Sequence, residues 1–276
     1  MPSLNRPDGI DIHWEEWGEG PLVVLAPFLN HHPSAFADVI ADLTRDYRVA
    51  RFDARGTGES TRVGPHDIET NSADLAAVIE RAGPPAVVVT VGDGLNRALR
   101  VAAQRPDLIS AILGVGVVSP VGLKELRRHA DAMMTSDSVP GMIIEQIRRD
   151  YRGALRATVA LPNRQMSENE VRARVDAQAS YCAAETAAAQ LQAWIDDDPL
   201  EPSRRLGDRL WLVWHPDIAG PMFPPLSEMQ DMAARMVPDA HVEIIEDGMV
   251  SRPDLTAAIV RRITASARAE ERAAAT

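Results

Sequence analysis

The chain has 276 residues, of which 45% are hydrophobic and 25% are charged, and its formal net charge at pH 7 is −11. These values predict a soluble globular protein that is large enough to bury a sizeable core. The negative charge argues against nucleic acid and anionic membranes as partners, because both are bound through basic surfaces.

The number of cysteines and the first residues of the chain indicate the cell compartment in which we expect the protein. Cys182 is the single cysteine, which excludes an internal disulfide and fits a reducing compartment. The opening residues, MPSLNRPDGI, contain no apolar signal segment. No apolar run approaches the roughly 20 residues of a membrane span. We therefore expect a cytoplasmic protein that acts on a small molecule, with a homodimer as an open alternative.

Apolar strands alternate with amphipathic helices in the first part of the chain. The pattern predicts strands at 10–17, 22–25, 48–52, 86–91 and 109–118, and helices at 35–43, 71–82 and 95–104. Strands that alternate with helices of about 10 residues predict a mainly parallel sheet with helices on both faces.

The pattern becomes helical after Ser119-Pro120, with candidate helices at 123–134, 142–155 and 168–194. Strands at 210–214 and 241–245 and helices at 226–236 and 254–263 then restore the alternation. We expect residues 265–276 to form a frayed helix or a loose tail. The predicted organisation is a core in two parts, 1–120 and 203–276, and a helical cap at 121–202.

One stretch, 86–106, has the sequence context of a nucleophile elbow. An apolar β-branched run leads into Gly92-Asp93-Gly94, and helical periodicity follows. A strand, a tight turn and a helix in this order are what a nucleophile elbow requires. The turn nevertheless contains neither serine nor cysteine.

Four segments together resemble the α/β-hydrolase fold. They are the apolar segment at 22–26, the D-x-R-G-x-G-x-S segment at 53–60, the elbow unit at 86–104 and the PDLI that follows it at 106–109. The resemblance covers almost the whole chain. It implies an eight-stranded, mainly parallel sheet flanked by helices, with the helical cap inserted after the sixth strand.

The catalytic positions of that family are occupied differently here. The nucleophile position falls on Gly92 and the histidine position on Met249. Neither residue can take up or transfer a proton, so the resemblance implies a degenerate triad. The acid position falls on Asp217, and the match to the family at this position allows a shift of one residue. The backbone amides of Phe28 and Asp93 occupy the two oxyanion-donor positions.

Parallel sheets bind ligands at the carboxyl ends of their strands, where several candidate groups gather. Asp93 is either a nucleophile, as aspartate is in epoxide hydrolases and haloalkane dehalogenases, or a cap of the following helix. His31, His32 and His215 are candidate acid–base groups. The remaining predicted pocket residues are Gly92, Asn30, Trp214 and Met249. We predict no metal and no cofactor, because the His31-His32 pair lacks a third ligand at useful spacing.

These features lead to one expected function and two alternatives. The expectation is a non-hydrolytic enzyme of specialised metabolism that catalyses a cyclisation, isomerisation, elimination or lyase reaction on a small, partly apolar metabolite. The first alternative is a hydrolase that uses Asp93 or activates water directly. The second is a ligand-binding protein without catalysis.

Overall fold

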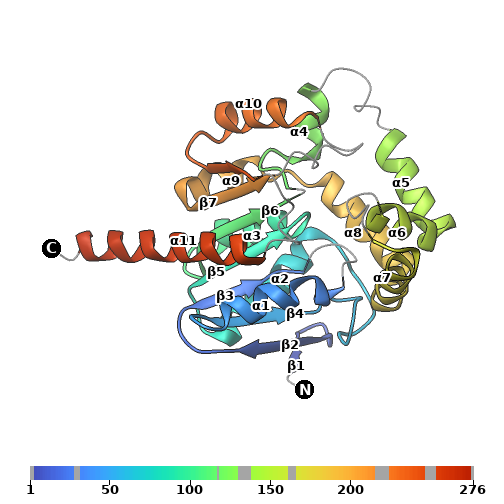
Figure 1. Cartoon of the computed structure of the whole chain (residues 1–276), viewed down its shortest axis with the longest axis horizontal. Coiled ribbons are helices and arrows are strands. Elements are labelled where there is room, and N and C mark those ends of the chain that lie inside the picture. Colours follow the sequence, from blue (N-terminus) through green and yellow to red (C-terminus); the bar gives the residue numbers. More distant parts are fainter. Residues whose placement is uncertain are drawn as a thin grey trace.

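A computed structural model describes residues 3–27, 32–116, 118–129, 138–160, 166–214, 224–245 and 253–274. Within these ranges, eight strands form one sheet in the order β1-β2-β4-β3-β5-β6-β7-β8 (Figure 1). The strands are β1 (Ser3–Asn5), β2 (Asp11–Trp17), β3 (Leu22–Leu25), β4 (Arg48–Phe52), β5 (Ala86–Val91), β6 (Ile109–Val115), β7 (Leu210–Trp214) and β8 (His241–Ile244). Among the described strands, the pairs β1–β2 and β2–β4 are antiparallel and the other five pairs are parallel, which confirms the predicted mainly parallel sheet.

Helices cover both faces of the sheet. On one face, α1 (Ala37–Leu43) and α11 (Pro253–Ala274) pack over the alternate residues of the central strands. On the other face lie α2 (Ile68–Ala82), α3 (Gly94–Gln104), α9 (Leu200–Leu206) and α10 (Leu226–Met236). The central strand β5 is buried along its whole length, because its neighbours and both helical layers cover it.

The cap consists of helices inserted between β6 and β7, as the resemblance implied. These helices are α4 (Gly122–His129), α5 (Ser138–Arg149), α6 (Tyr151–Ala160), α7 (Glu168–Tyr181) and α8 (Ala184–Asp196). Helices α5 to α8 lie together at one side of the sheet, whereas α4 is drawn near α10 (Figure 1). Leu123, Leu191 and Trp194 of the cap belong to the same buried cluster as the core helices. The cap boundaries at 121 and 202 stay predictions.

Several predicted element bounds are wrong, for identifiable reasons. The strand predicted over 109–118 ends at Val115, because Gly116 turns the chain with a φ of 71°. The helix predicted over 168–194 is two helices, separated by the extended backbone of Cys182. Helix α11 continues to Ala274 instead of ending near 263, since alanine, arginine and glutamate are strong helix formers.

No helix in the described ranges combines the length and the apolar character that a membrane crossing requires.

Candidate functional site

The elbow predicted at 86–106 is present in the structure. Strand β5 ends at Val91, Gly92 has a φ of 53°, and α3 begins at Gly94. A positive φ is costly for most residues but not for glycine, which has no Cβ. The turn therefore keeps the backbone conformation of a strand-to-helix elbow with glycine at its apex.

Close packing holds this turn against the loop that follows β3. A Cβ on Gly94 would lie 2.0 Å from Thr90 Oγ1 and 3.1 Å from the carbonyl oxygen of Pro27. Only glycine fits so close to both groups. The first turn of α3 and the start of the loop after β3 therefore meet at the carboxyl edge of the sheet.

The Asp93 carboxylate is bound by an arginine and does not cap the helix. Asp93 has helical backbone angles, φ −65° and ψ −18°, and its side chain makes no capping hydrogen bond. The predicted cap is wrong because a capping side chain needs extended backbone at this position. Arg97, one helical turn later, forms an ion pair with the Asp93 carboxylate, and both side chains are buried. Arg97 Nη1 also donates to the Pro27 carbonyl at 3.5 Å.

His32 lies close to the cap. Its ring contacts the ring of Tyr181 edge to face, with centroids 5.5 Å apart. Burial lowers the pKa of His32, the charge of Arg51 lowers it further, and Asp53 opposes both. His32 Nδ1 accepts a hydrogen bond from the backbone N–H of Ser34 at 3.2 Å, so the neutral ring carries its proton on Nε2.

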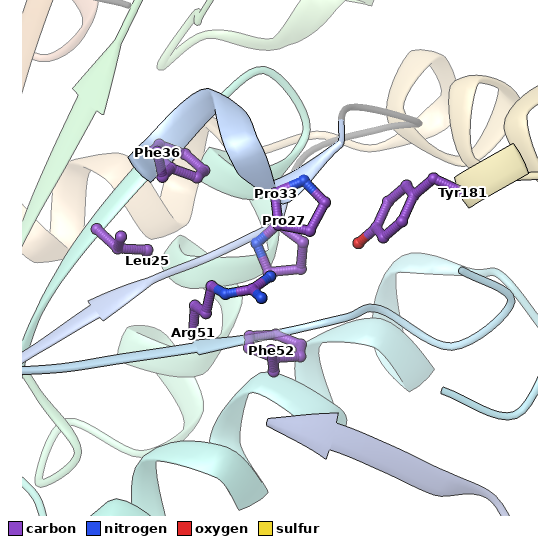
Figure 2. Close-up of a pocket in the computed structure, with 7 residues that line it drawn as sticks. All are labelled: Leu25, Pro27, Pro33, Phe36, Arg51, Phe52 and Tyr181. Carbon is purple, nitrogen blue, oxygen red and sulfur yellow. The ribbon is translucent and has the colours of Figure 1, made fainter. Parts of the chain in front are cut away.

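A small cavity lies beside His32, between the ends of β3 and β4 and the cap (Figure 2). It is lined mainly by apolar residues, with one arginine and one tyrosine: Leu25, Pro27, Pro33, Phe36, Arg51, Phe52 and Tyr181. Its volume of about 10 Å³ corresponds to about one water molecule. Arg51 was not predicted as a pocket residue from the sequence, because β4 (RVARF) carries two arginines and nothing in this pattern distinguishes Arg51 from Arg48.

Tyr181 joins the cap to the D-x-R-G-x-G-x-S loop at 53–60. Its hydroxyl donates to Asp53 Oδ1 at 3.1 Å, and its carbonyl accepts from the backbone N–H of Gly58 at 2.8 Å. The neighbouring Cys182 forms a β-bridge with Thr57. These bonds explain why the predicted long helix is broken here: the junction of α7 and α8 pairs with the loop.

Within the same loop, Asp53 and Arg55 hold the backbone in place. Asp53 Oδ2 accepts from the backbone N–H of Glu59 at 3.0 Å. Arg55 makes two bonds to Asp74 at 2.7 and 2.9 Å and one to Asp8 at 2.8 Å. Arg55 and Asp74 are both buried, and each compensates the other's charge.

The structure brings together only part of the predicted site. Asp93, Gly92 and His32 lie at the carboxyl edge of the sheet or beside it. Trp214 is fully buried, and its Nε1 donates to the carbonyl of Val118 at 3.1 Å. The other predicted site residues lie outside the described residues: Phe28, Asn30, His31, His215, Asp217 and Met249.

Known enzymes are similar to this chain in sequence or in structure, although no family model matches it. A non-heme haloperoxidase of Rhodococcus erythropolis is 37% identical over 130 residues, which are 44% of this chain and 46% of the relative. The lipase LipV of Mycobacterium tuberculosis is 30% identical over 129 residues, 46% of this chain and 49% of the relative. The chain therefore spans about half the length of these two curated relatives.

Solved structures match over nearly the whole chain. An esterase from Exiguobacterium antarcticum superimposes with a TM-score of 0.80 and 17% identity, covering 95% of this chain and 98% of the esterase. An enol-lactonase from Burkholderia xenovorans superimposes with a TM-score of 0.70 and 18% identity, covering 96% and 100%. The chain therefore has the α/β-hydrolase fold.

These comparisons correct the expected function. The similar proteins include a lipase, an esterase and an enol-lactonase, all of which are named for hydrolysis. Nothing among them supports a lyase, an isomerase, a cyclase or a role in specialised metabolism. The prediction of a non-hydrolytic reaction is therefore wrong, and the hydrolase alternative is better supported.

Proposed function

We propose that the chain is a hydrolase of small carboxylic esters or lactones, and that water attacks the substrate carbonyl without a serine nucleophile. The observation that carries this proposal is the elbow itself: Gly92 keeps the positive φ of the turn, and Asp93 leads into the first turn of α3. The names of the similar lipase and esterase support hydrolysis as the reaction.

The backbone at the elbow supplies electrostatic stabilisation. When water adds to a carbonyl, negative charge develops on the carbonyl oxygen, and N–H groups directed at that oxygen lower the barrier. The amide of Asp93 lies at the N-terminal end of α3, where the helix dipole is positive. We assign the second donor to the amide of Phe28, which follows Pro27 in the chain.

Water is the nucleophile that the residues of the turn favour. Gly92 has no side-chain oxygen, so it cannot form an acyl-enzyme. The Asp93 carboxylate is occupied by Arg97, so we assign its N–H, and not its carboxylate, to the reaction. The attacking water forms a new C–O bond to the carbonyl carbon and gives a proton to a base. The C–O bond to the alcohol oxygen then breaks, and the base returns the proton to that oxygen.

We assign the base to one of two histidines. His215 follows Trp214, the last residue of β7, and His31 precedes His32 in the loop after β3. Both strands end at the carboxyl edge that carries the elbow. Asp217 would orient His215, and the Nε2–H of His32 would donate to the substrate.

Hydrolysis in heavy-oxygen water tests the nucleophile. We expect the chain to hydrolyse p-nitrophenyl acetate, p-nitrophenyl butyrate or a γ-lactone, and a single turnover to place the heavy oxygen in the acid product only. Heavy oxygen in the peptide that contains Asp93 would instead show a carboxylate nucleophile. A serine adduct with a fluorophosphonate would show that the elbow is not the reacting centre.

Substitution of the histidines tests the base. We expect His215→Ala or His31→Ala to lower kcat about 100-fold or more, the usual effect of losing a general base. His241→Ala is the matched control, because His241 stacks on Trp211 at the far edge of the sheet. Full activity in both variants would contradict a histidine base.

A further inference from the structure

Three side chains between the cap and the elbow carry polar atoms without hydrogen-bond partners in the described part of the chain. They are Arg97 Nε, His66 Nδ1 and both amide atoms of Gln190. Arg97 and Gln190 are 2% and 1% exposed. Leaving a buried donor or acceptor unpaired is unfavourable, so three such groups in one region point to a ligand.

Contacts before and after Gln190 bring this part of α8 close to His66 and to the first turn of α3. Thr186 Oγ1 lies 3.5 Å from His66 Nε2, and Gln190 lies one turn later on the same face of α8. Further along α8, the side chain of Asp197 accepts from Asn96 Nδ2 at 2.8 Å. Asn96 directly precedes Arg97 in α3. Gln190 therefore lies between the contacts that α8 makes with His66 and with the start of α3.

The unpartnered atoms offer hydrogen-bond donors. Arg97 Nε and Gln190 Nε2 are donors by their chemistry. When the Thr186 hydroxyl donates to His66 Nε2, the neutral ring carries its proton on Nδ1, which makes that atom a third donor. Three donors of this kind can bind the oxygen atoms of a carboxylate, and the Gln190 amide presents its Nε2–H and not its oxygen to such a ligand.

The local charge also favours an anion. Burial lowers the pKa of His66, and the positive charges of Arg55 and Arg97 lower it further against the opposing charge of Asp67. The positive charge of Arg97 also lowers the pKa of the Cys182 thiol in the cap, against the raising effect of burial. These two arginines can attract an acceptor with negative charge, although Arg55 is already paired with Asp74 and Arg97 with Asp93.

We propose that Arg97, His66 and Gln190 form a subsite for a carboxylate of the substrate. The substrate would then be an ester or lactone that carries an acid group a few bonds from the reacting carbonyl. This inference rests on the proposed hydrolase function for its substrate, because Arg97 is also bound to Asp93 at the elbow. Carboxylate binding itself does not depend on turnover.

Calorimetric titration with glutarate tests the subsite directly. We expect the native chain to bind glutarate and Gln190→Leu to bind it at least about tenfold more weakly, since a hydrogen bond to a charged group is lost. Gln192→Leu is the matched control, because Gln192 is exposed on the same helix and bonds to Asp196. Equal binding by native and Gln190→Leu protein, or no binding by the native chain, would overturn the subsite.

A second variant removes the donor while keeping the charge opposite Asp93. Arg97→Lys retains a cation for the buried carboxylate but lacks the Nε–H of arginine. We expect it to fold and to bind glutarate at least about tenfold more weakly. Native-like glutarate affinity in this variant would remove Arg97 from the subsite.

Ester hydrolysis separates this inference from the proposed function. We expect monoethyl glutarate to have a KM at least about tenfold below that of ethyl butyrate, and Gln190→Leu to abolish the difference. If neither ester is hydrolysed but glutarate binding depends on Gln190, the subsite stands and the hydrolase proposal falls. If both esters are hydrolysed with equal KM and glutarate does not bind, the hydrolase proposal stands and the subsite falls.

Discussion

At the scale of single residues, the elbow depends on how little space lies between Thr90, Gly94 and Pro27. We expect Gly94→Ala to lower the free energy of unfolding by about 2 kcal/mol, because its Cβ would meet Thr90 Oγ1 at 2.0 Å inside a packed core. Urea denaturation measures the change. Gly141→Ala is the control, because a Cβ there meets nothing within 4 Å, and this helical site should gain up to about 1 kcal/mol. Equal effects at both glycines would contradict the close packing.

The Asp93–Arg97 pair gives a second residue-scale prediction. Asp93→Ala alone should lower the free energy of unfolding by about 3–5 kcal/mol, because it leaves the buried charge of Arg97 without compensation. The double variant Asp93→Ala/Arg97→Met should be less destabilised than the single one, since it removes both charges. A double-mutant cycle in urea measures the coupling. Additive effects of the two substitutions would show that the pair contributes nothing.

At the scale of elements, the junction of α7 and α8 attaches the cap to the core. We expect Tyr181→Phe to lower the free energy of unfolding by about 2 kcal/mol, because Asp53 loses a buried hydrogen bond. Hydrogen exchange at the amide of Gly58, which donates to the Tyr181 carbonyl at 2.8 Å, should become several-fold faster.

The control for this junction is Tyr47→Phe. This substitution also removes a hydroxyl hydrogen bond, the one between Tyr47 and Thr264 at 2.7 Å. Tyr47, however, packs with α11 on the face of the sheet that carries α1 and α11, away from the junction of α7 and α8. Exchange at Gly58 should stay at its native rate in this variant. If Tyr181→Phe also leaves the Gly58 rate unchanged, the hydroxyl of Tyr181 does not hold the junction.

Most elements of the core and the helical character of the cap could be predicted from local patterns, whereas the break between α7 and α8 could not. Strands β3, β5 and β7 have the predicted bounds, because each is a short, largely apolar run between turn residues. Strand β4 also has its predicted bounds, although its sequence, RVARF, contains two arginines. The break at Cys182 carries no such signal: the sequence from α7 to α8 contains no glycine or proline. The break exists because distant residues, Thr57 and Gly58, pair with this junction.

At the scale of the whole molecule, two half-buried histidines make stability depend on pH. Burial lowers the pKa of His32 and His66 below the ordinary value of 6.5. Below pH 6.5 the unfolded chain therefore takes up protons before the folded chain does, and stability is lost as the pH falls toward the folded pKa values. Above pH 6.5 these histidines are neutral in both states, so they contribute no pH dependence to the free energy of unfolding.

Urea midpoints at about pH 7.5 and about pH 5.5 measure this dependence. We expect the midpoint of the native chain to be lower at the acid pH, and the double variant His32→Gln/His66→Gln to show a smaller loss. Most carboxylates keep their charge over this range, so the difference between the two proteins reports on the histidines. An unchanged loss in the double variant would assign the pH dependence to other groups.

The sequence by itself determined the order of the elements, the α/β-hydrolase fold and the glycine at the apex of the elbow, because strand, turn and helix signals are local. Only the tertiary structure decided what surrounds the elbow. It placed the Tyr181 hydroxyl on Asp53, 128 residues away, and Thr186 of α8 beside His66, 120 residues away. Such contacts depend on how distant segments pack, and no local pattern encodes that packing.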